Sequence, residues 1–270
     1  MQYVNAQNTQ VPALGFGTFE LEPEIARKMV AHALDTGYRH IDTAQMYENE
    51  EAVGGAITAS GVDRGDIFLT TKVWMDNYAD GDLQKSVKTS LDKLETDYVD
   101  LLLLHWPNPD VDLEETLGAL ADAKKRGMAR NIGISNFPTD WMKRALPHVK
   151  LLTNQVEYHP YLDQSAVLQA ARGAHMAVTA YCPLAQGKVF DDPTLKQIGE
   201  KHGKNGGQVT LRWLLQQDVI AIPRSSKPEH VDSNLEVFDF ELSDDEMQQI
   251  HGLSKPDGRI IDPGFAPEWD

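Results

Sequence analysis

The sequence predicts a (β/α)8 TIM barrel that begins with a short hairpin and forms a single domain from residues 1–270. Short apolar segments of strand type recur along the chain, most of them starting roughly 25–30 residues after the previous one, as successive βα units do. Segments with helical periodicity separate them. No linker or low-complexity stretch divides the chain, and barrels of this length commonly form one domain.

The predicted elements follow one another in a regular order. Residues 3–13 (YVNAQNTQVPA) predict a hairpin that closes the floor of the barrel. Helical patterns cover 23–37, 82–96 and 113–127, and the third ends with a charged turn and Gly127, as a helix stop should. The eight segments predicted as barrel strands are 13–18, 39–44, 67–72, 98–105, 129–135, 152–157, 176–181 and 219–223.

A doubly wound parallel sheet is the alternative fold for such an alternating chain. That fold normally carries G-x-G-x-x-G between its first strand and its first helix. Residues 15–20 (GFGTFE) have the first two of these glycines and lack the third. The barrel is therefore the preferred prediction.

The charge balance restricts the partners that the protein can have. The formal net charge is −16 and the isoelectric point is about 4.9, so nucleic acid and anionic membranes would be repelled. We therefore expect neither as a partner. If the protein binds an anion, the positive charge for it must be concentrated locally.

Cysteine and histidine usage argues against disulfides and metals. Cys182 is the single cysteine, which excludes an internal disulfide and a cysteine-rich metal site. The histidines lack H-E-x-x-H or similar ligand spacing, so we predict no metal. The first residues show no secretory signal, and the longest apolar run is residues 101–104. We expect a cytoplasmic protein and, without a sequence feature that decides oligomeric state, a monomer.

Four polar residues stand at or just beyond the ends of predicted strands. Asp42, Lys72 and His105 each close an apolar segment, and Tyr47 lies one short loop past Asp42. Successive strands of a barrel deliver such side chains to one rim. A lysine ammonium stabilises a nearby phenolate, so Lys72 is expected to lower the pKa of Tyr47. An aspartate can orient that lysine, and an imidazole can donate to a carbonyl oxygen. The set suits protonation of an oxygen that gains negative charge.

Each of these residues also fits an ordinary structural role. Asp42 could cap a helix, Lys72 could be a solvated strand end, His105 could be a core histidine, and Tyr47 could pack against a loop. Their coincidence at successive strand ends favours the catalytic interpretation. A two-carboxylate glycosidase on the same barrel lacks a second carboxylate at a strand end.

The chain resembles the aldo-keto reductases, and within them the bacterial 2,5-diketo-D-gluconate reductases. The patterns around Asp42, Tyr47 and His105 are the most specific, and the likeness extends to the terminal residues 266–270. The matching stretches are 15–19, 37–54, 70–74, 97–107, 132–137, 154–162, 180–188 and 222–234.

This resemblance implies NADPH-dependent reduction of small aldehydes and ketones. Tyr47 would be the general acid, Lys72 and Asp42 would tune it, and His105 would orient the carbonyl. Phe19, Trp74 and Trp106 match positions around the carbonyl, so small polar or aromatic substrates are expected, such as methylglyoxal, nitrobenzaldehyde or diketogluconate. The implied cofactor contacts are Thr18, Asp42, Ser135, Asn136, Gln155, Tyr181, Leu184, Gln186, Gly187, Arg224, Ser225, Ser226, Lys227, His230 and Asn234.

The segment 222–230 (IPRSSKPEH) predicts a phosphate site on independent grounds. It follows the last strand and enters a helix, where free N–H groups and basic side chains attract phosphate. It departs from the family at two positions, with Arg224 for the usual lysine and His230 for the usual arginine. Arg224, Ser225 and Lys227 should favour the 2′-phosphate of NADPH, so NADPH is expected to be preferred. Because a histidine carries little charge at neutral pH, NADH is expected to be usable as well.

Two other functions remain open at this stage. Relatives of this family serve as nicotinamide-binding, redox-sensing regulatory proteins on the same barrel. A barrel hydrolase would need neither Tyr181 nor the phosphate segment. The complete set of Asp42, Tyr47, Lys72 and His105 favours the reductase over both.

Overall fold

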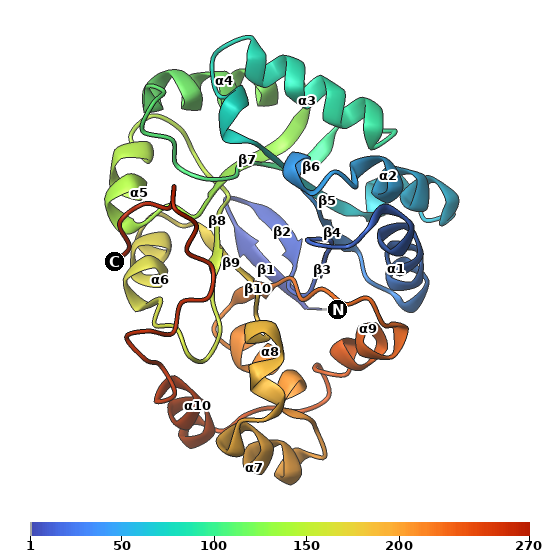
Figure 1. Cartoon of the computed structure of the whole chain (residues 1–270), viewed down its shortest axis with the longest axis vertical. Coiled ribbons are helices and arrows are strands. Elements are labelled where there is room, and N and C mark those ends of the chain that lie inside the picture. The colour runs from blue at the N-terminus through green and yellow to red at the C-terminus, as the bar shows by residue number, and fades with distance from the viewer. Residues whose placement is uncertain (1) are drawn as a thin grey trace.

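The computed structural model describes residues 2–270 and contains a closed ring of eight parallel strands (Figure 1). Neighbouring strands pair in chain order from β3 to β10. Backbone hydrogen bonds from Gly15 N to Ala221 O (2.8 Å) and from Gly17 N to Pro223 O (3.0 Å) join the first strand to the last. The strands are β3 (Phe16–Gly17), β4 (His40–Asp42), β5 (Phe68–Val73), β6 (Val99–Leu104), β7 (Ala129–Ser135), β8 (Thr153–Glu157), β9 (Ala177–Tyr181) and β10 (Val219–Ala221).

Each of the eight predicted strands is therefore confirmed, and the doubly wound alternative is wrong. β5 and β7 are as long as the segments that predicted them, and the other six strands are shorter because the ends of those segments turn into the loops. Gly17 permits the closure of the ring, since a Cβ there would lie 2.8 Å from the carbonyl oxygen of Ile222.

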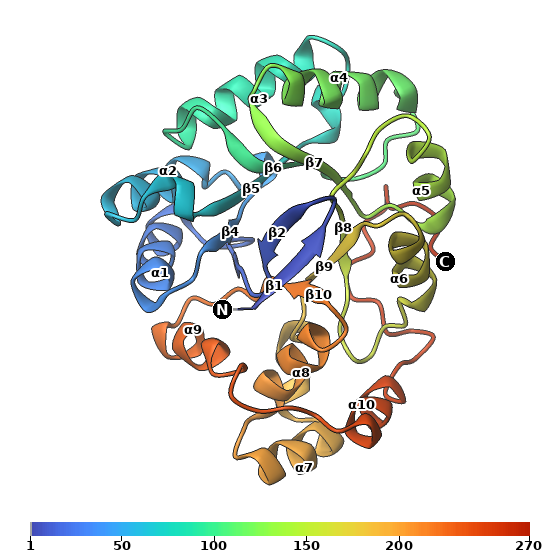
Figure 2. The ribbon, with the colours of Figure 1, turned by 180° about the vertical axis from the view of Figure 1, so that it is seen from behind.

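Helices form the outer layer around the ring in both views (Figures 1 and 2). The three predicted helices are confirmed as α1, α3 and α4. α1 begins with Pro23 and ends at Gly37, whose φ of 110° suits a glycine stop. The α-helices are α1 (Pro23–Thr36), α2 (Glu50–Ala59), α3 (Asp82–Lys93), α4 (Leu113–Lys125), α5 (Thr139–Ala145), α6 (Ser165–Gly173), α7 (Pro193–His202), α8 (Gly206–Leu215), α9 (Pro228–Leu235) and α10 (Asp244–His251).

The predicted hairpin is also confirmed. β1 (Tyr3–Ala6) and β2 (Thr9–Pro12) pair antiparallel across the middle of the ring (Figure 2). Thr9 donates to Asn131 near the start of β7, and the His40 ring contacts the Pro12 carbonyl at the start of β4. The hairpin thus covers the N-terminal ends of the strands and leaves their C-terminal ends for the site.

The C-terminal segment continues for nineteen residues beyond α10. Residues 252–270 return from α10 along the ring, past β8, to α5 (Figure 1). Glu157, at the end of β8, accepts the N–H groups of Ile260 (2.7 Å) and Ile261 (2.8 Å). Asp270 accepts the N–H of Thr139 at the start of α5. We call residues 258–270 the C-terminal strap.

Within residues 2–270, every helix falls short of the length and apolar character that a bilayer crossing needs.

Candidate active site

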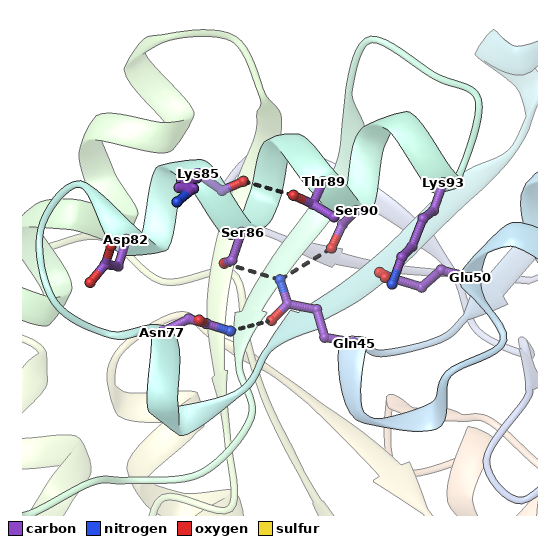
Figure 3. A pocket seen from close by; sticks show the side chains of 9 residues that line it. All are labelled: Gln45, Glu50, Asn77, Asp82, Lys85, Ser86, Thr89, Ser90 and Lys93. Atoms are coloured by element: carbon purple, nitrogen blue, oxygen red, sulfur yellow. Dashed lines mark hydrogen bonds between the residues drawn. The ribbon is translucent and has the colours of Figure 1, made fainter.

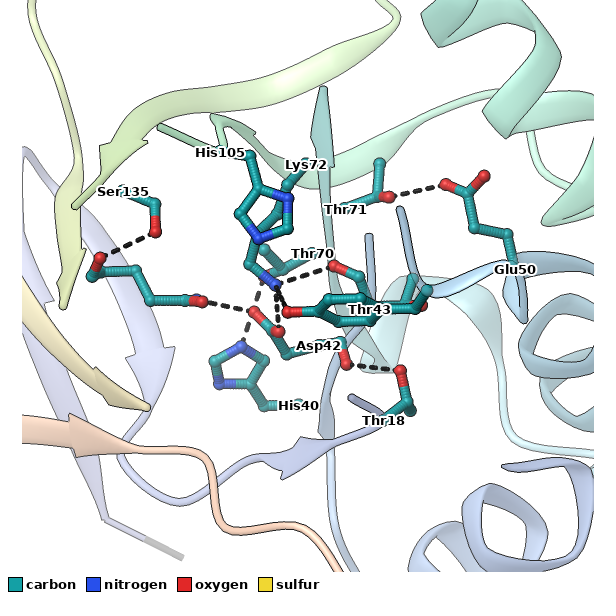
Figure 4. Close-up of polar contacts among 12 residues, drawn as sticks. Thr18, His40, Asp42, Thr43, Glu50, Thr70, Thr71, Lys72, His105 and Ser135 are labelled. Atoms are coloured by element: carbon teal, nitrogen blue, oxygen red, sulfur yellow. Dashed lines mark hydrogen bonds and ion pairs between the residues drawn. The ribbon is translucent and has the colours of Figure 1, made fainter. Parts of the chain in front are cut away.

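The structure brings Asp42, Lys72 and His105 together at the C-terminal end of the barrel (Figure 4), and Tyr47 contacts both Lys72 and His105. Lys72 Nζ donates to Asp42 Oδ1 at 2.5 Å, to the Thr43 carbonyl at 2.9 Å and to Tyr47 Oη at 3.2 Å. The Tyr47 and His105 rings lie edge to face with centroids 5.7 Å apart. Asp42 ends β4, Lys72 lies in β5, His105 follows β6, and Tyr47 ends a 3-10 turn, η1 (Gln45–Tyr47).

Lys72 is fully buried and remains charged. Burial lowers its pKa, but Asp42 and then Tyr47 raise it by more, so the net pKa is above its ordinary value. The ammonium is therefore a fixed positive charge between the carboxylate and the phenol.

The pKa of Tyr47 moves opposite to the prediction from sequence. Burial raises it most, Lys72 lowers it and Asp42 raises it, and the net pKa lies above the ordinary value. The contribution of Lys72 thus has the predicted sign, but burial outweighs it, which the sequence could not show. The phenol is consequently held in its protonated form, the form that a proton donor needs.

His105 is held neutral. Burial and then Lys72 move its pKa well below the ordinary value. Its Nδ1 is buried without a hydrogen-bond partner among the described residues. A proton placed on Nδ1 would have no acceptor, so the tautomer with Nε2–H is favoured, and that N–H can donate to a bound oxygen.

Further polar residues hold the cluster in place through hydrogen bonds. Gln155 Nε2 donates to the other oxygen of Asp42 at 2.7 Å, and Ser135 Oγ donates to the Gln155 carbonyl. Asn136 donates to the His105 carbonyl and accepts from the Tyr181 hydroxyl at 2.7 Å. The contact of Gln155 with Asp42 is a link that sequence reasoning missed, because no local pattern joins β8 to β4.

A cavity of about 620 Å³ is lined by Asp42, Tyr47 and His105 of this cluster and by residues of α9. Its wall includes four non-glycine residues with φ between 49° and 63°, a conformation that is costly and often associated with binding sites: Glu20, Asn136, Cys182 and Gln186. Predicted cofactor residues that line it are Thr18, Asp42, Ser135, Asn136, Gln155, Tyr181, Leu184, Gln186, Gly187, Arg224, His230 and Asn234.

The cavity fits an extended dinucleotide. Amide and hydroxyl side chains line the cavity near Tyr47, and Arg224 and His230, which could supply positive charge to a phosphate, line it as well. Arg224 Nη2 pairs with Glu20 at 2.9 Å. Ser225 instead closes a turn through its bond with the Lys227 N–H. Ser226 and Lys227 are exposed and do not line the cavity.

Aromatic rings surround the other side of Tyr47 and His105. Phe19 packs on Tyr47, and Trp74 packs on His105, with centroids 5.1 and 5.4 Å apart. Phe265 of the strap contacts Trp74 and Trp106, at 5.8 and 5.4 Å. Trp269 contacts Trp106 as well. We call Phe19, Trp74, Trp106, Phe265 and Trp269 the aromatic arc. The sequence predicted Phe19, Trp74 and Trp106 and missed Phe265 and Trp269, although the aromatic residues of the last ten positions were a signal.

Comparisons with known proteins agree with this geometry. The family model described as the aldo/keto reductase family matches residues 13–255. The chain belongs to the aldo/keto reductase family. It is an oxidoreductase that acts on carbonyl compounds, and the family uses nicotinamide cofactors.

Relatives of this reductase cover nearly its whole length. Methylglyoxal reductase DkgB of Escherichia coli O157:H7 is 43% identical over 265 residues, which is 96% of this chain and 99% of the relative. Glyoxal reductase of Bacillus subtilis is 41% identical over 249 residues, 91% of this chain and 90% of the relative. A solved structure described as a 2,5-diketo-D-gluconic acid reductase B is 50% identical, with a TM-score of 0.98 and coverage of 100% and 98%.

The reductase has a second, polar hollow of about 340 Å³ behind the site (Figure 3). Gln45 crosses it: its amide nitrogen donates to Ser86 and Ser90 of α3, and its amide oxygen accepts the Trp74 N–H at 2.9 Å. Gln45 begins the turn that carries Tyr47. Gln45, in the wall of this hollow, therefore links the turn of Tyr47 to the backbone of Trp74.

Proposed function

We propose that this reductase transfers hydride from NADPH to small aldehydes and ketones, with Tyr47 as the proton donor. The observation that carries the proposal is the buried chain of contacts from Asp42 through Lys72 to Tyr47 at the mouth of the cavity. A phenol, an ammonium and a neutral imidazole around one apolar-walled position suit a carbonyl oxygen that becomes an alkoxide.

Each residue has a separate role in this step. His105 donates a hydrogen bond to the carbonyl oxygen and fixes its direction. Tyr47 passes its proton to that oxygen as negative charge develops, and Lys72 stabilises the phenolate that remains. Asp42 holds Lys72 in place. The bound nicotinamide supplies the hydride.

The cavity residues divide into groups along the dinucleotide. Ser135, Asn136 and Gln155 would hold the carboxamide, and Tyr181 would pack against the nicotinamide ring. Leu184, Gln186 and Gly187 lie along the pyrophosphate, and Thr18 and Asn234 complete the walls. Arg224 and His230 of the cavity wall, with Ser225, Ser226 and Lys227 of the turn between them, make up the proposed site for the 2′-phosphate, which makes NADPH the preferred cofactor and leaves NADH usable.

Substrates of the sizes of methylglyoxal, nitrobenzaldehyde and diketogluconate fit the proposal, because the aromatic arc leaves a compact site. The names of the relatives, which are glyoxal, methylglyoxal and diketogluconic acid reductases, support this range. The single domain, the monomeric state and the cytoplasmic location expected from the sequence stay predictions.

A panel of small aldehydes and ketones, assayed by nicotinamide absorbance with NADPH and NADH in turn, tests the proposal. We expect turnover of several small carbonyls, faster with NADPH. Tight cofactor binding without turnover of any of them would instead favour the redox-sensing regulatory function.

A further inference from the structure

We infer that Glu20 limits the preference for NADPH over NADH, because its carboxylate competes with the 2′-phosphate for the guanidinium of Arg224. This inference deepens the proposed function and rests on it. Among residues 2–270, Arg224 is the one side chain with a permanent positive charge in the cavity wall. That cation already has an anionic partner.

Glu20 and Arg224 lie on neighbouring loops at the rim of the barrel. Glu20 belongs to the loop between β3 and α1, and Arg224 to the loop between β10 and α9. The two loops are adjacent because β3 and β10 close the ring through the hydrogen bond from Gly17 N to Pro223 O. Arg224 Nη2 donates to Glu20 Oε2 at 2.9 Å, and both residues line the cavity. The ion pair is thus part of the cavity wall.

Both charges of the pair act on a neighbouring group in that wall. Burial raises the pKa of the Cys182 thiol to about 11, and among the smaller effects Arg224 lowers this pKa and Glu20 raises it. Cys182 lines the same cavity next to Tyr181. A phosphate held by Arg224 would therefore lie within the field of the Glu20 carboxylate as well.

The backbone of Glu20 also points to a specific role for its side chain. Its φ is 56°, a conformation that glycine adopts freely and that is costly for a residue with a Cβ. Such conformations persist where the surrounding structure holds them, and they cluster at binding sites. Among the described residues, Arg224 is the polar partner of the Glu20 side chain. The turn thus presents the carboxylate to the guanidinium.

The pair is exposed enough to exchange partners. The side chains of Arg224 and Glu20 are 44% and 59% exposed, and such pairs add little stability. A phosphate can accept two N–H groups from a guanidinium, so it can displace the carboxylate. The displaced Glu20 then remains beside the phosphate and repels it.

The second carboxylate of the wall does not act in this way. Asp42 accepts from Lys72 through one oxygen and from Gln155 through the other, so its charge is balanced within the site. Among residues 2–270, Glu20 and Asp42 are the acidic side chains that line the cavity. Glu20 is therefore the carboxylate that opposes a 2′-phosphate. NADH has no such phosphate and is not opposed.

Glu20→Gln tests the inference by binding, because it removes the charge and keeps the size of the side chain. We would measure the dissociation constants of NADPH and NADH at low salt by equilibrium titration of nicotinamide fluorescence. The variant should bind NADPH about three- to fivefold more tightly, the range expected for an exposed ion pair, and NADH as before. The gain should shrink in high salt, which screens exposed charges.

Glu22→Gln is the matched control for net charge. Glu22 is exposed, lies outside the cavity wall and makes no side-chain cap of α1, so its variant should change neither constant. Calorimetry with adenosine 2′,5′-bisphosphate and 5′-AMP, which differ only in the 2′-phosphate, isolates the group concerned. Glu20→Gln should tighten the bisphosphate and leave 5′-AMP unchanged.

Three results would overturn the inference. They are an unchanged dissociation constant for NADPH in Glu20→Gln, equal tightening of NADPH and NADH, and weaker binding of NADPH, which would mean that Glu20 orients Arg224 toward the phosphate. A wild-type protein that binds neither cofactor, or that reduces no small carbonyl compound, would instead reject the proposed function.

Discussion

At the residue scale, Lys72 is the residue on which the site depends. Its ammonium contacts Asp42 and Tyr47 in a position that solvent does not reach. Removing one partner of a buried, hydrogen-bonded charge leaves the other unpaired and is strongly destabilising. Asp42 therefore serves stability in addition to its proposed catalytic role, and Tyr47, which is a neutral partner, is the member that can be altered with the least structural consequence.

His230 offers a residue-scale test of cofactor choice. His230→Arg should lower the dissociation constant for NADPH several-fold and leave that for NADH almost unchanged, because a permanent charge is added only where the 2′-phosphate is expected. Equilibrium titration of nicotinamide fluorescence measures both constants. The exposed His175, in the turn between α6 and β9, gives the control His175→Arg. Equal tightening of both cofactors by His230→Arg would mean that His230 does not face the 2′-phosphate.

At the element scale, the C-terminal strap adds side chains to a site whose other residues come from the strand ends and loops of the barrel. Glu157 is wholly buried, and its carboxylate accepts two consecutive strap N–H groups together with His159. The strap then carries Ile261 into the cavity wall and Phe265 onto Trp74 and Trp106. Glu157 is a positioning residue for the substrate side.

Glu157→Gln should loosen the strap without disturbing Tyr47 or Lys72. Its amide keeps one acceptor oxygen and loses the charge, and hydrogen bonds to charged groups contribute about 1.5–3 kcal/mol. We expect faster hydrogen exchange at residues 258–265 and a several-fold higher KM for aromatic aldehydes, with kcat changed less. Glu268→Gln, on the exposed part of the strap, is the control. Unaltered exchange in Glu157→Gln would contradict the positioning role.

At the scale of the whole molecule, two buried histidines link stability to pH. Burial lowers the pKa of His40 and His105, and in the unfolded chain both histidines take up protons near pH 6.5. The unfolded state therefore binds more protons below that pH, and stability falls as the pH is lowered. Glu50, whose pKa burial raises, acts in the opposite direction at lower pH.

Urea unfolding between pH 7.5 and 5.5 measures this linkage. The free energy of unfolding should decrease toward acid, by up to about 1.4 kcal/mol per pH unit for each histidine that stays neutral in the fold. His105→Gln should reduce the change of the free energy of unfolding with pH by the contribution of one histidine. A variant slope identical to that of the wild type would show that His105 is protonated in the folded protein.

The barrel could be predicted from sequence because its signals are local. Apolar runs mark the strands, and a residue at the end of such a run must lie at the rim, so Asp42, Lys72 and His105 could be placed together. Phe265 and Trp269 could not be placed, since residues 258–270 have no periodic pattern and follow a path set by Glu157 and Thr139. The raised pKa of Tyr47 depends on burial, which is a property of the packed fold.

The central claim is that Tyr47 donates the proton, and Tyr47→Phe tests it most directly. Single-turnover reduction of methylglyoxal or 4-nitrobenzaldehyde should slow by a factor of about 10²–10⁴, because only the hydroxyl is removed. NADPH affinity and the unfolding midpoint should stay near wild type, and Tyr98→Phe, whose ring packs between Arg64 and Arg130, should leave the rate unchanged. Reduction by Tyr47→Phe at close to the wild-type rate would contradict the account.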